Sequence, residues 1–376
     1  MKRVVDKGKT LLVDGPASVI IILGEVEVLG ASLKTGVKIV VREGKRIPLK
    51  IKEKAEFDLA LGERAAVNEV EGSTIPVSWG KAADEVLDRE KPVTVMVVGG
   101  VDSGKTSFCA YLANRALRES RSVALIDADL GQSDVGPPST IGSCRLTKPI
   151  IDPFEIGAES ICFVGVTSPS GAVSKVVEGI AGMKEKALKR GVDILIINTD
   201  GWIEGEDAVR YKVALAKEIK PDLLVGIQEK GELTFLLGAL TETQNLVVES
   251  SPAVRKRDRE ERKLLRELGY KKYLKGARTE SFPLRWIRVG GVAVRKGDEE
   301  GLLVALHDVN ENFLGIGVVE GIDYERRVIR VFTPVREGVA SLIVGRVKLD
   351  RKGREIGLSD VFAERKTNFA CVCALG

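Results

Sequence analysis

The stretch Val93-Thr-Val-Met-Val-Val-Gly-Gly-Val-Asp-Ser-Gly-Lys-Thr106 joins an apolar run to a glycine-rich loop. The run predicts a buried β-strand, and the apolar periodicity that continues to about Glu119 predicts a helix directly after the loop. Gly99–Thr106 fits the pattern G-x-x-x-x-G-K-[ST] of a P-loop, in which backbone N–H groups and a helix N-terminus bind phosphate. A glycine-rich turn can match this pattern by chance, but a strand before it and a helix after it favour a nucleotide site.

Two side chains of this loop carry its chemistry. Lys105 can reach the β- and γ-phosphates of a nucleotide, and the Thr106 hydroxyl can ligate Mg²⁺. We therefore predict ATP and Mg²⁺ as cofactors. The residues assigned to ATP binding in the loop are Gly99, Gly100, Val101, Asp102, Ser103, Gly104, Lys105, Thr106 and Ser107.

The next strand ends in two carboxylates, in the stretch Val123-Ala-Leu-Ile-Asp-Ala-Asp-Leu-Gly-Gln132. One carboxylate beside a P-loop can hold Mg²⁺, and the other can accept a proton from an attacking hydroxyl. Asp127 ends the apolar run and is assigned to the metal, whereas Asp129 lies further into the loop and is assigned to the substrate. The alternative is an ordinary acidic turn at the end of a strand.

The P-loop lies in a part of the chain where apolar strands alternate with helical segments, whereas the flanking parts alternate apolar and polar residues between glycine turns. Near-continuous apolar strands separated by helices predict a mainly parallel sheet covered on both faces. We predict an α/β fold, with a central P-loop NTPase domain between two small β-rich domains. The expected domains are residues 1–80 (β-rich), 81–280 (P-loop kinase domain with an Arg-rich lid) and 281–376 (β-rich).

A strongly basic segment runs from Arg255 to Arg278. At 100° per residue, four of its arginines fall in one narrow stripe of a helix. An anion such as phosphate would relieve their mutual repulsion. The alternative is a solvated helix face with ion pairs to Glu260 and Glu261. The four arginines of the stripe are Arg255, Arg259, Arg262 and Arg266.

Overall composition excludes few function classes. The net charge of +4 permits a nucleic-acid partner without demanding one. The single histidine, His307, and scattered cysteines without a CxxC pair argue against a soft-ligand metal site and favour a reducing cytoplasm. No apolar run is long enough for a membrane helix, so no membrane association is expected. Few glutamines and many Lys, Arg and Glu residues are typical of proteins from hot habitats. The five cysteines are Cys109, Cys144, Cys162, Cys371 and Cys373.

The order of the motifs resembles the polynucleotide 5′-hydroxyl-kinase family. The P-loop is followed by Asp127-x-Asp129-x-Gly-Gln132, by the strand end Asn198-Thr-Asp-Gly-Trp202 and by the basic helix. This family includes the eukaryotic pre-mRNA cleavage-factor kinase subunit, the nucleolar pre-rRNA-processing kinase and archaeal relatives. The resemblance implies transfer of the γ-phosphate of ATP to the 5′-hydroxyl of RNA, with DNA ends left open as acceptors.

The resemblance also implies roles for individual residues. Lys105 and Thr106 would bind phosphates and Mg²⁺, and Asp129 would be the base for the acceptor hydroxyl. In the family a T-x-G-W clasp contacts the terminal nucleotide, and an arginine lid closes over the γ-phosphate. The RNA-binding residues implied are Gln132, Thr199, Gly201 and Trp202, with Trp202 stacking on a base or, alternatively, lying in the core. Family spacing selects the lid arginines Arg257, Arg262 and Arg266, with Arg262 and Arg266 shared with the helical stripe.

Three other functions would also use a nucleotide-binding P-loop. A non-catalytic ATP-binding scaffold of an RNA-processing complex is the main alternative, but it does not need Lys105, Asp129 and the lid arginines. A GTPase would need Asn-Lys-x-Asp at a strand end, where this chain has Ile227-Gln-Glu-Lys-Gly231. A small-molecule kinase would not need the basic helix and the clasp tryptophan. Neither the protein partners nor the adenine-reading residue follows from the sequence.

Overall fold

The computed structural model describes residues 1–359, so Cys371, Cys373 and the end of the predicted 281–376 domain lie outside the described residues. The chain divides into two compact units. The division into domains 1–80, 81–280 and 281–376 stays a prediction. Unit 1 comprises residues 1–129, 144–156 and 180–261, and the described residues of unit 2 are 130–143, 157–179 and 262–359.

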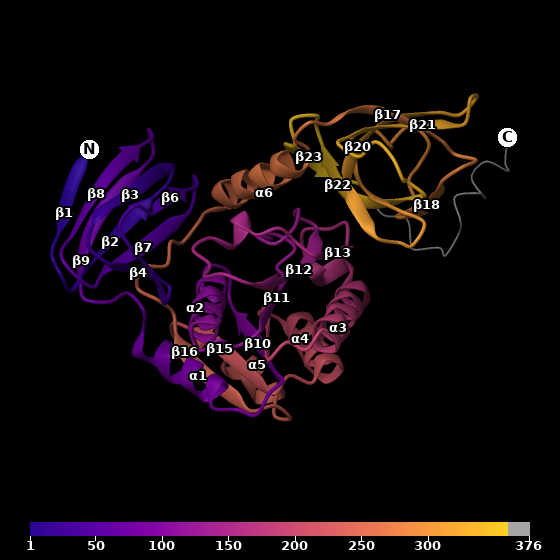
Figure 1. The fold of residues 1–376 in the computed structure, drawn as a ribbon. Helices are drawn as coiled ribbons and strands as arrows, with labels where there is room; N and C mark the ends of the chain where they lie inside the picture. The colour runs from indigo at the N-terminus through magenta and orange to yellow at the C-terminus, as the bar shows by residue number, and fades with distance from the viewer. Residues whose placement is uncertain (360–376) are drawn as a thin grey trace. The chain divides into compact units, whose positions relative to one another are not determined.

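The first part of unit 1 is built from two antiparallel sheets with alternating burial (Figure 1). Strands such as β7 bury every second residue, because one face of each sheet packs inward. The first sheet has the order β1 (Lys2–Val5), β8 (Ala55–Leu61), β3 (Ala17–Leu23), β6 (Lys38–Val41). The second has the order β5 (Ala31–Leu33), β4 (Val26–Val28), β7 (Arg46–Ile51), β2 (Lys9–Asp14), β9 (Ala66–Glu71).

A seven-stranded sheet carries the P-loop, and its central strands are parallel. All residues of β10, β11 and β14 are buried, as expected for strands covered on both faces. The predicted α/β fold with a mainly parallel sheet is confirmed; β12 and β13, at one edge, pair antiparallel. The order is β13 (Ser160–Phe163), β12 (Thr140–Leu146), β11 (Val123–Ala128), β14 (Ile194–Thr199), β10 (Val93–Gly99), β15 (Leu223–Gln228), β16 (Asn245–Glu249).

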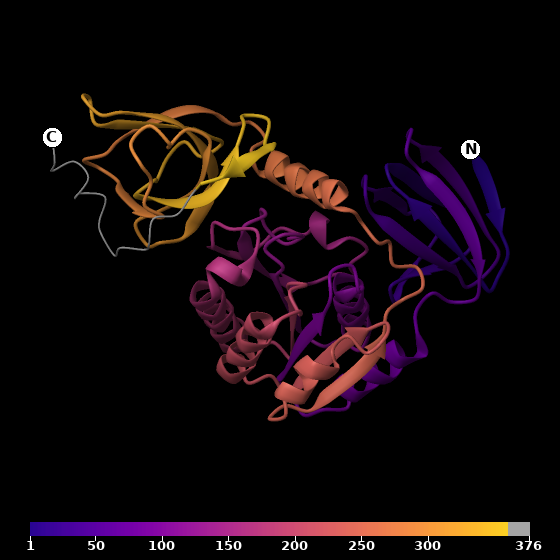
Figure 2. The same cartoon turned by 180° about the vertical axis from the view of Figure 1, so that it is seen from behind.

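Helices cover both faces of this sheet. Helix α1 contacts β16, α2 contacts β14, and the two helices contact each other. Figures 1 and 2 show α2 on one side of β10 and α4 on the other. Within residues 1–359, no helix is long and apolar enough to cross a membrane. The helices are α1 (Val77–Leu87), α2 (Lys105–Arg118), α3 (Val173–Lys189), α4 (Glu206–Ile219), α5 (Thr234–Ala239) and α6 (Arg259–Tyr273), with 3₁₀ turns at Pro153–Glu155 and Pro169–Gly171.

Unit 2 contains a second seven-stranded sheet at the end of the described chain. Tyr270 of α6 is fully buried in an apolar cluster with residues of this sheet, and its hydroxyl lies 2.8 Å from Ser139 Oγ. The β-rich character predicted after residue 281 is thus present. The order is β17 (Arg278–Pro283), β21 (Val328–Thr333), β20 (Phe313–Asp323), β19 (Leu302–His307), β22 (Ser341–Leu349), β18 (Arg288–Gly291), with β23 (Glu355–Leu358) on β22.

The predicted stripe of four arginines on one helix is wrong for Arg255. Helix α6 begins only at Arg259, because Asp258 and Glu261 form a reciprocal cap. The Asp258 carboxylate accepts from the Glu261 N–H at 2.8 Å, and the Glu261 carboxylate accepts from the Asp258 N–H at 3.2 Å. Arg255 therefore precedes the helix and forms an ion pair with Glu261.

Candidate functional site

The P-loop lies between β10 and α2, at the carboxyl end of the sheet. Gly104 has φ of +100°, a conformation that L-residues with side chains rarely adopt, and it caps helix α2 directly before Lys105. Lys105 is 6% exposed, and its ammonium donates to the Gly100 carbonyl over 2.7 Å. Burial lowers the pKa of Lys105, while the charge of nearby Asp129 raises it. An anion that entered the loop would therefore meet a poorly solvated cation.

Thr106 and Asp127 are joined through the side chain of Asn198. The Asn198 amide nitrogen donates to the Asp127 Oδ1 over 3.0 Å and lies 3.3 Å from the Thr106 Oγ1. Asp127 is almost fully buried at the end of β11. The structure thus brings together the two residues that the sequence assigned to a metal, and it adds Asn198, to which the sequence gave no role.

The oxygen donors at this point fit Mg²⁺. A hydroxyl and a carboxylate are hard ligands, and Mg²⁺ at phosphate sites takes its remaining ligands from phosphates and water. Within residues 1–359 the Asn198 Oδ1 is buried without a hydrogen-bond partner, as expected where a water or ion belongs. The described chain holds no group of three or more His, Cys, Asp or Glu side chains able to bind a metal alone, so the phosphates would have to contribute.

Asp129 differs from Asp127 in exposure. It is half-buried, whereas Asp127 is 2% exposed, and its backbone N–H lies 3.3 Å from the Asp127 Oδ1. Burial lowers the pKa of Lys105, and the negative charge of Asp129 opposes that shift. The more accessible carboxylate is thus the one that the sequence assigned to the substrate.

The clasp Thr199–Trp202 follows β14 and packs against the P-loop. A Cβ at position 201 would lie 2.6 Å from Val101 Cγ2 and 2.8 Å from the Val101 nitrogen, so only glycine fits. Trp202 is half-buried and stacks on Tyr211, with ring centroids 5.9 Å apart and an interplanar angle of 21°. Thr199 is fully buried and donates to the Val97 carbonyl over 2.8 Å, so its assignment to RNA stays a prediction.

Arg257 lies against the P-loop, ahead of helix α6. Its Nη1 donates to the Asp102 Oδ1 over 2.6 Å, and its Nε donates to the Gly44 carbonyl of the N-terminal sheets over 3.0 Å. Asp102 itself has a left-handed φ of 54°, which costs a non-glycine residue conformational energy. The one lid arginine placed in unit 1 is therefore tied to the phosphate loop.

The remaining predicted site residues belong to unit 2. Gln132 donates through Nε2 to the Arg262 carbonyl over 3.1 Å. Arg266 donates through Nε and Nη2 to the two carboxylate oxygens of Glu355, over 2.6 and 2.8 Å. Arg266 is thus held in a forked ion pair that the sequence did not predict, because Glu355 lies 89 positions away in the chain.

Comparison with known proteins places the chain in a family. A family model described as "mRNA cleavage and polyadenylation factor CLP1 P-loop" matches residues 99–276, from the P-loop through helix α6. A polyribonucleotide 5′-hydroxyl-kinase of Thermococcus kodakarensis is 30% identical over 340 residues, which cover 76% of this chain and 96% of that protein. The chain belongs to the family of CLP1 proteins and archaeal polyribonucleotide 5′-hydroxyl-kinases.

Further relatives support this family assignment. A polyribonucleotide 5′-hydroxyl-kinase of Pyrococcus abyssi is 27% identical over 335 residues, 74% of this chain and 94% of that protein. A solved structure of a wild-type Clp1p–Pcf11p complex is similar with a TM-score of 0.75 at 14% identity, covering 93% of this chain and 97% of that chain. At that identity, the solved structure is evidence for the fold alone. The resemblance to the family predicted from the motifs is confirmed.

Three residues near the family's clasp were missed from the sequence: Asp200, Tyr211 and Lys212. All are buried, and they hydrogen-bond one another beneath Trp202. One signal was readable. Helix α4 has an apolar stripe at 208, 211, 215, 216 and 219, and Lys212 falls inside it, where a lysine needs a buried partner.

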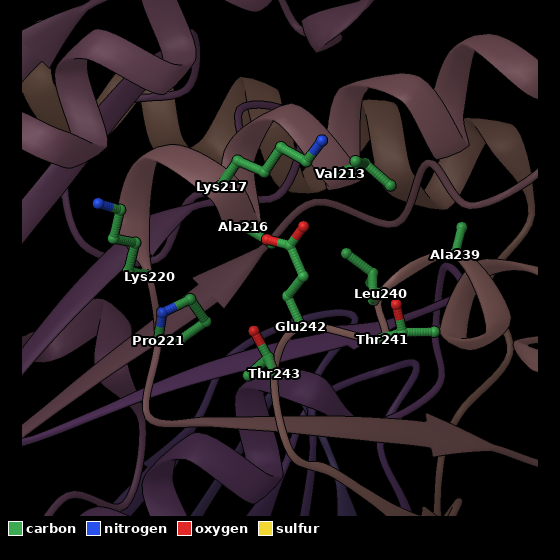
Figure 3. Close-up of a pocket in the computed structure, with 10 residues that line it drawn as sticks. All are labelled: Val213, Ala216, Lys217, Lys220, Pro221, Ala239, Leu240, Thr241, Glu242 and Thr243. Atoms are coloured by element: carbon green, nitrogen blue, oxygen red, sulfur yellow. The ribbon is translucent and has the colours of Figure 1, made fainter.

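A hollow of about 380 Å³ in the same unit is lined by other residues of helix α4 and of the segments that follow it. It is lined by the ends of α4 and α5 and by residues before β15 and β16, so it lies at the amino ends of those strands. Figure 3 shows the Glu242 side chain extending toward Ala216 and Lys217 of α4. Ligands of parallel sheets bind at the carboxyl ends, and none of the predicted site residues lines this hollow.

Proposed function

We propose that this chain transfers the γ-phosphate of ATP to the 5′-hydroxyl end of RNA. The observation that carries the proposal is the contact of the clasp with the phosphate loop at Gly201 and Val101. A nucleotide site and a candidate platform for an acceptor nucleoside thereby share one compact unit. Relatives named polyribonucleotide 5′-hydroxyl-kinases, similar over most of their length, support the same activity.

Family membership implies ATP as a substrate, and we extend this to Mg²⁺. Lys105 and the loop Gly99–Ser107 would hold the phosphates, with Arg257 contributing a cation from its position against Asp102. Thr106 and Asp127 would hold the metal, because Asn198 brings their oxygens together. An Mg²⁺ ion held there would supply positive charge to offset that of the phosphates.

The protein's own groups then have separate tasks. Asp129 accepts the proton of the 5′-hydroxyl as that oxygen forms its bond to the γ-phosphorus and the bond to the ADP oxygen breaks. Lys105, Arg262 and Arg266 neutralise charge on the transferring group. Gln132, Thr199, Gly201 and Trp202 orient the RNA end, with Trp202 stacking on its base without regard to base identity.

The proposal includes RNA as the main partner, with DNA ends to be decided by experiment, and it names no protein partner. We place the activity in the cytoplasm, a proposal supported by the scattered cysteines of the sequence, which contain no CxxC pair. The reaction is the same whether the protein acts in RNA processing or in RNA repair.

Transfer of labelled γ-phosphate from ATP to synthetic oligonucleotides tests the function. We expect label on 5′-hydroxyl RNA with wild-type protein and none with Lys105→Ala. The same RNA carrying a 5′-phosphate is the matched control, because it offers no acceptor hydroxyl. The ratio of labelled RNA to labelled DNA defines the acceptor class. ATP binding without label on any oligonucleotide would overturn the proposal and favour an ATP-binding scaffold.

A further inference from the structure

Helix α4 buries a lysine in its apolar stripe. Lys212 is 0% exposed and lies among the buried residues Ala208, Leu215 and Ala216 of the helix. Removing an ammonium from water costs several kcal/mol unless a charged, hydrogen-bonded partner is present. A protein with an apolar residue of similar volume at such a position is often as stable as the protein with the buried ion pair, or more stable. The lysine therefore calls for an explanation beyond the stability of the helix.

The partner of Lys212 is the clasp residue Asp200. The ammonium donates to the Asp200 Oδ2 over 2.9 Å and to the Asp200 carbonyl over 3.1 Å. The Tyr211 hydroxyl donates to the same carboxylate oxygen over 2.8 Å. Burial, followed by the charge of Asp200, raises the pKa of Tyr211 well above its usual value, so that hydroxyl keeps its proton. Two donors from α4 thus fix one side of the carboxylate.

The other side of that carboxylate holds the clasp tryptophan. The Asp200 Oδ1 accepts a hydrogen bond from the Trp202 backbone N–H over 2.9 Å, and the Trp202 ring stacks on the Tyr211 ring with centroids 5.9 Å apart. Gly201, between them, packs against Val101 of the P-loop. The position of the indole relative to the phosphate loop is therefore set by contacts that start at Lys212.

We propose that Lys212, acting through Asp200 and Tyr211, is a positioning group that fixes Trp202 as the stacking platform for the terminal nucleoside of the acceptor. This inference rests on the proposed kinase function. One ring of the Tyr211–Trp202 pair is fully buried and the other half-buried, so the pair presents one aromatic surface to a ligand. The hydrogen bonds of this network end on the clasp at Asp200 and Trp202, whereas the P-loop lysine hydrogen-bonds the Gly100 carbonyl.

Steady-state kinetics of matched variants test the proposal. Tyr211→Phe removes one hydroxyl and keeps the ring, and Lys212→Met removes the ammonium at similar volume. We expect both to raise KM for 5′-hydroxyl RNA about 5- to 100-fold, the range for losing a base-stacking contact, with KM for ATP unchanged. Arg210→Ala, on the same helix with a 71% exposed side chain, is the control and should match the wild type.

A double-mutant cycle separates positioning from packing. If Lys212 acts through Trp202, then Lys212→Met should not raise KM for RNA further in a protein that already carries Trp202→Ala. If the fold-changes in KM for RNA of the two substitutions multiply in the double variant, or if KM is unchanged in both single variants, the inference is overturned. Transfer by the wild-type protein would still support the kinase function in that case. If Lys212→Met does not fold, Tyr211→Phe decides by the same criterion. Wild-type protein that labels no oligonucleotide would overturn the function and the inference together.

Discussion

The Arg257 guanidinium is hydrogen-bonded to the Asp102 carboxylate of the phosphate loop, with 2.6 Å between Nη1 and Oδ1. The Arg257 backbone N–H donates to the other carboxylate oxygen over 2.9 Å, and its Nε donates to the Gly44 carbonyl over 3.0 Å. One side chain thereby joins the N-terminal sheets, the P-loop and the segment before helix α6. The guanidinium is therefore held against the phosphate loop.

Replacing this arginine should weaken ATP binding. We expect Arg257→Ala to raise KM for ATP about 10-fold or more, because a charge-assisted contact is lost and the loop loses its support. ATP titrations at saturating RNA measure this effect. Lys256→Ala is the control, since the Lys256 side chain is 63% exposed and forms an ion pair with Glu229. Equal KM values for Arg257→Ala and the wild type would exclude Arg257 from the nucleotide site.

Local features of the sequence predicted the centre of the fold. The run Val93–Val98, the Gly-rich loop and the helix after it are encoded by adjacent residues, and β10 and α2 lie where they were expected. Asp127, near the end of β11, and Asp129, just after it, were also placed correctly at the carboxyl end of the sheet. Such patterns predict structure well because a continuous apolar run requires a strand buried on both faces, and the P-loop spacing requires a strand before it and a helix after it.

Contacts between distant segments were not readable. Nothing near Arg266 in the chain indicates Glu355, and nothing near Arg257 indicates the Gly44 carbonyl. The start of α6 could have been read from the D-x-x-E pattern at Asp258 and Glu261, which removes Arg255 from the helical stripe. Lys212 could have been flagged by its place in an apolar stripe, but its partner could not.

Lys105 should be costly to the stability of the ligand-free protein. We expect Lys105→Met to abolish transfer and to raise the free energy of unfolding by about 1 kcal/mol or more, because a buried ammonium is replaced by an apolar chain. The pKa of Lys105 is lowered by burial, so the folded state binds this proton more weakly than the unfolded state. The destabilisation caused by charged Lys105 is therefore greatest below its lowered pKa. It decreases as the pH rises toward the ordinary value of 10.5.

Denaturant unfolding of both proteins at about pH 7 and about pH 9.5 measures this difference. The advantage of Lys105→Met should be larger at the lower pH. A variant less stable than the wild type at both values would show that Lys105 supports the fold rather than burdening it. Ser107→Ala in the same loop, which changes no charge, serves as the control for pH effects elsewhere in the protein.

Asp129→Asn should separate chemistry from nucleotide binding. The amide keeps the shape of the side chain but cannot take the proton of the acceptor hydroxyl, so we expect kcat to fall about 100-fold or more. ATP affinity, measured by titration calorimetry, should change little because Asp127 and Thr106 retain their contacts with Asn198. A variant that transfers phosphate at the wild-type rate would remove Asp129 from the role of base.

Arg266 and Glu355 make it possible to distinguish a lid arginine from a structural one. Both side chains are largely buried, at 18% and 15% exposure, and they form two hydrogen bonds. Either Arg266→Ala or Glu355→Gln should lower the free energy of unfolding by about 1 to 3 kcal/mol, because a charged hydrogen bond is lost. Only Arg266→Ala should also reduce kcat, by about 100-fold or more, if its cation neutralises the transferring phosphoryl group.

Thermal melts compare the stability of the two variants, and initial rates measured well below both melting temperatures compare their kcat values. Equal kcat values for the two variants would assign Arg266 to the fold of unit 2 alone.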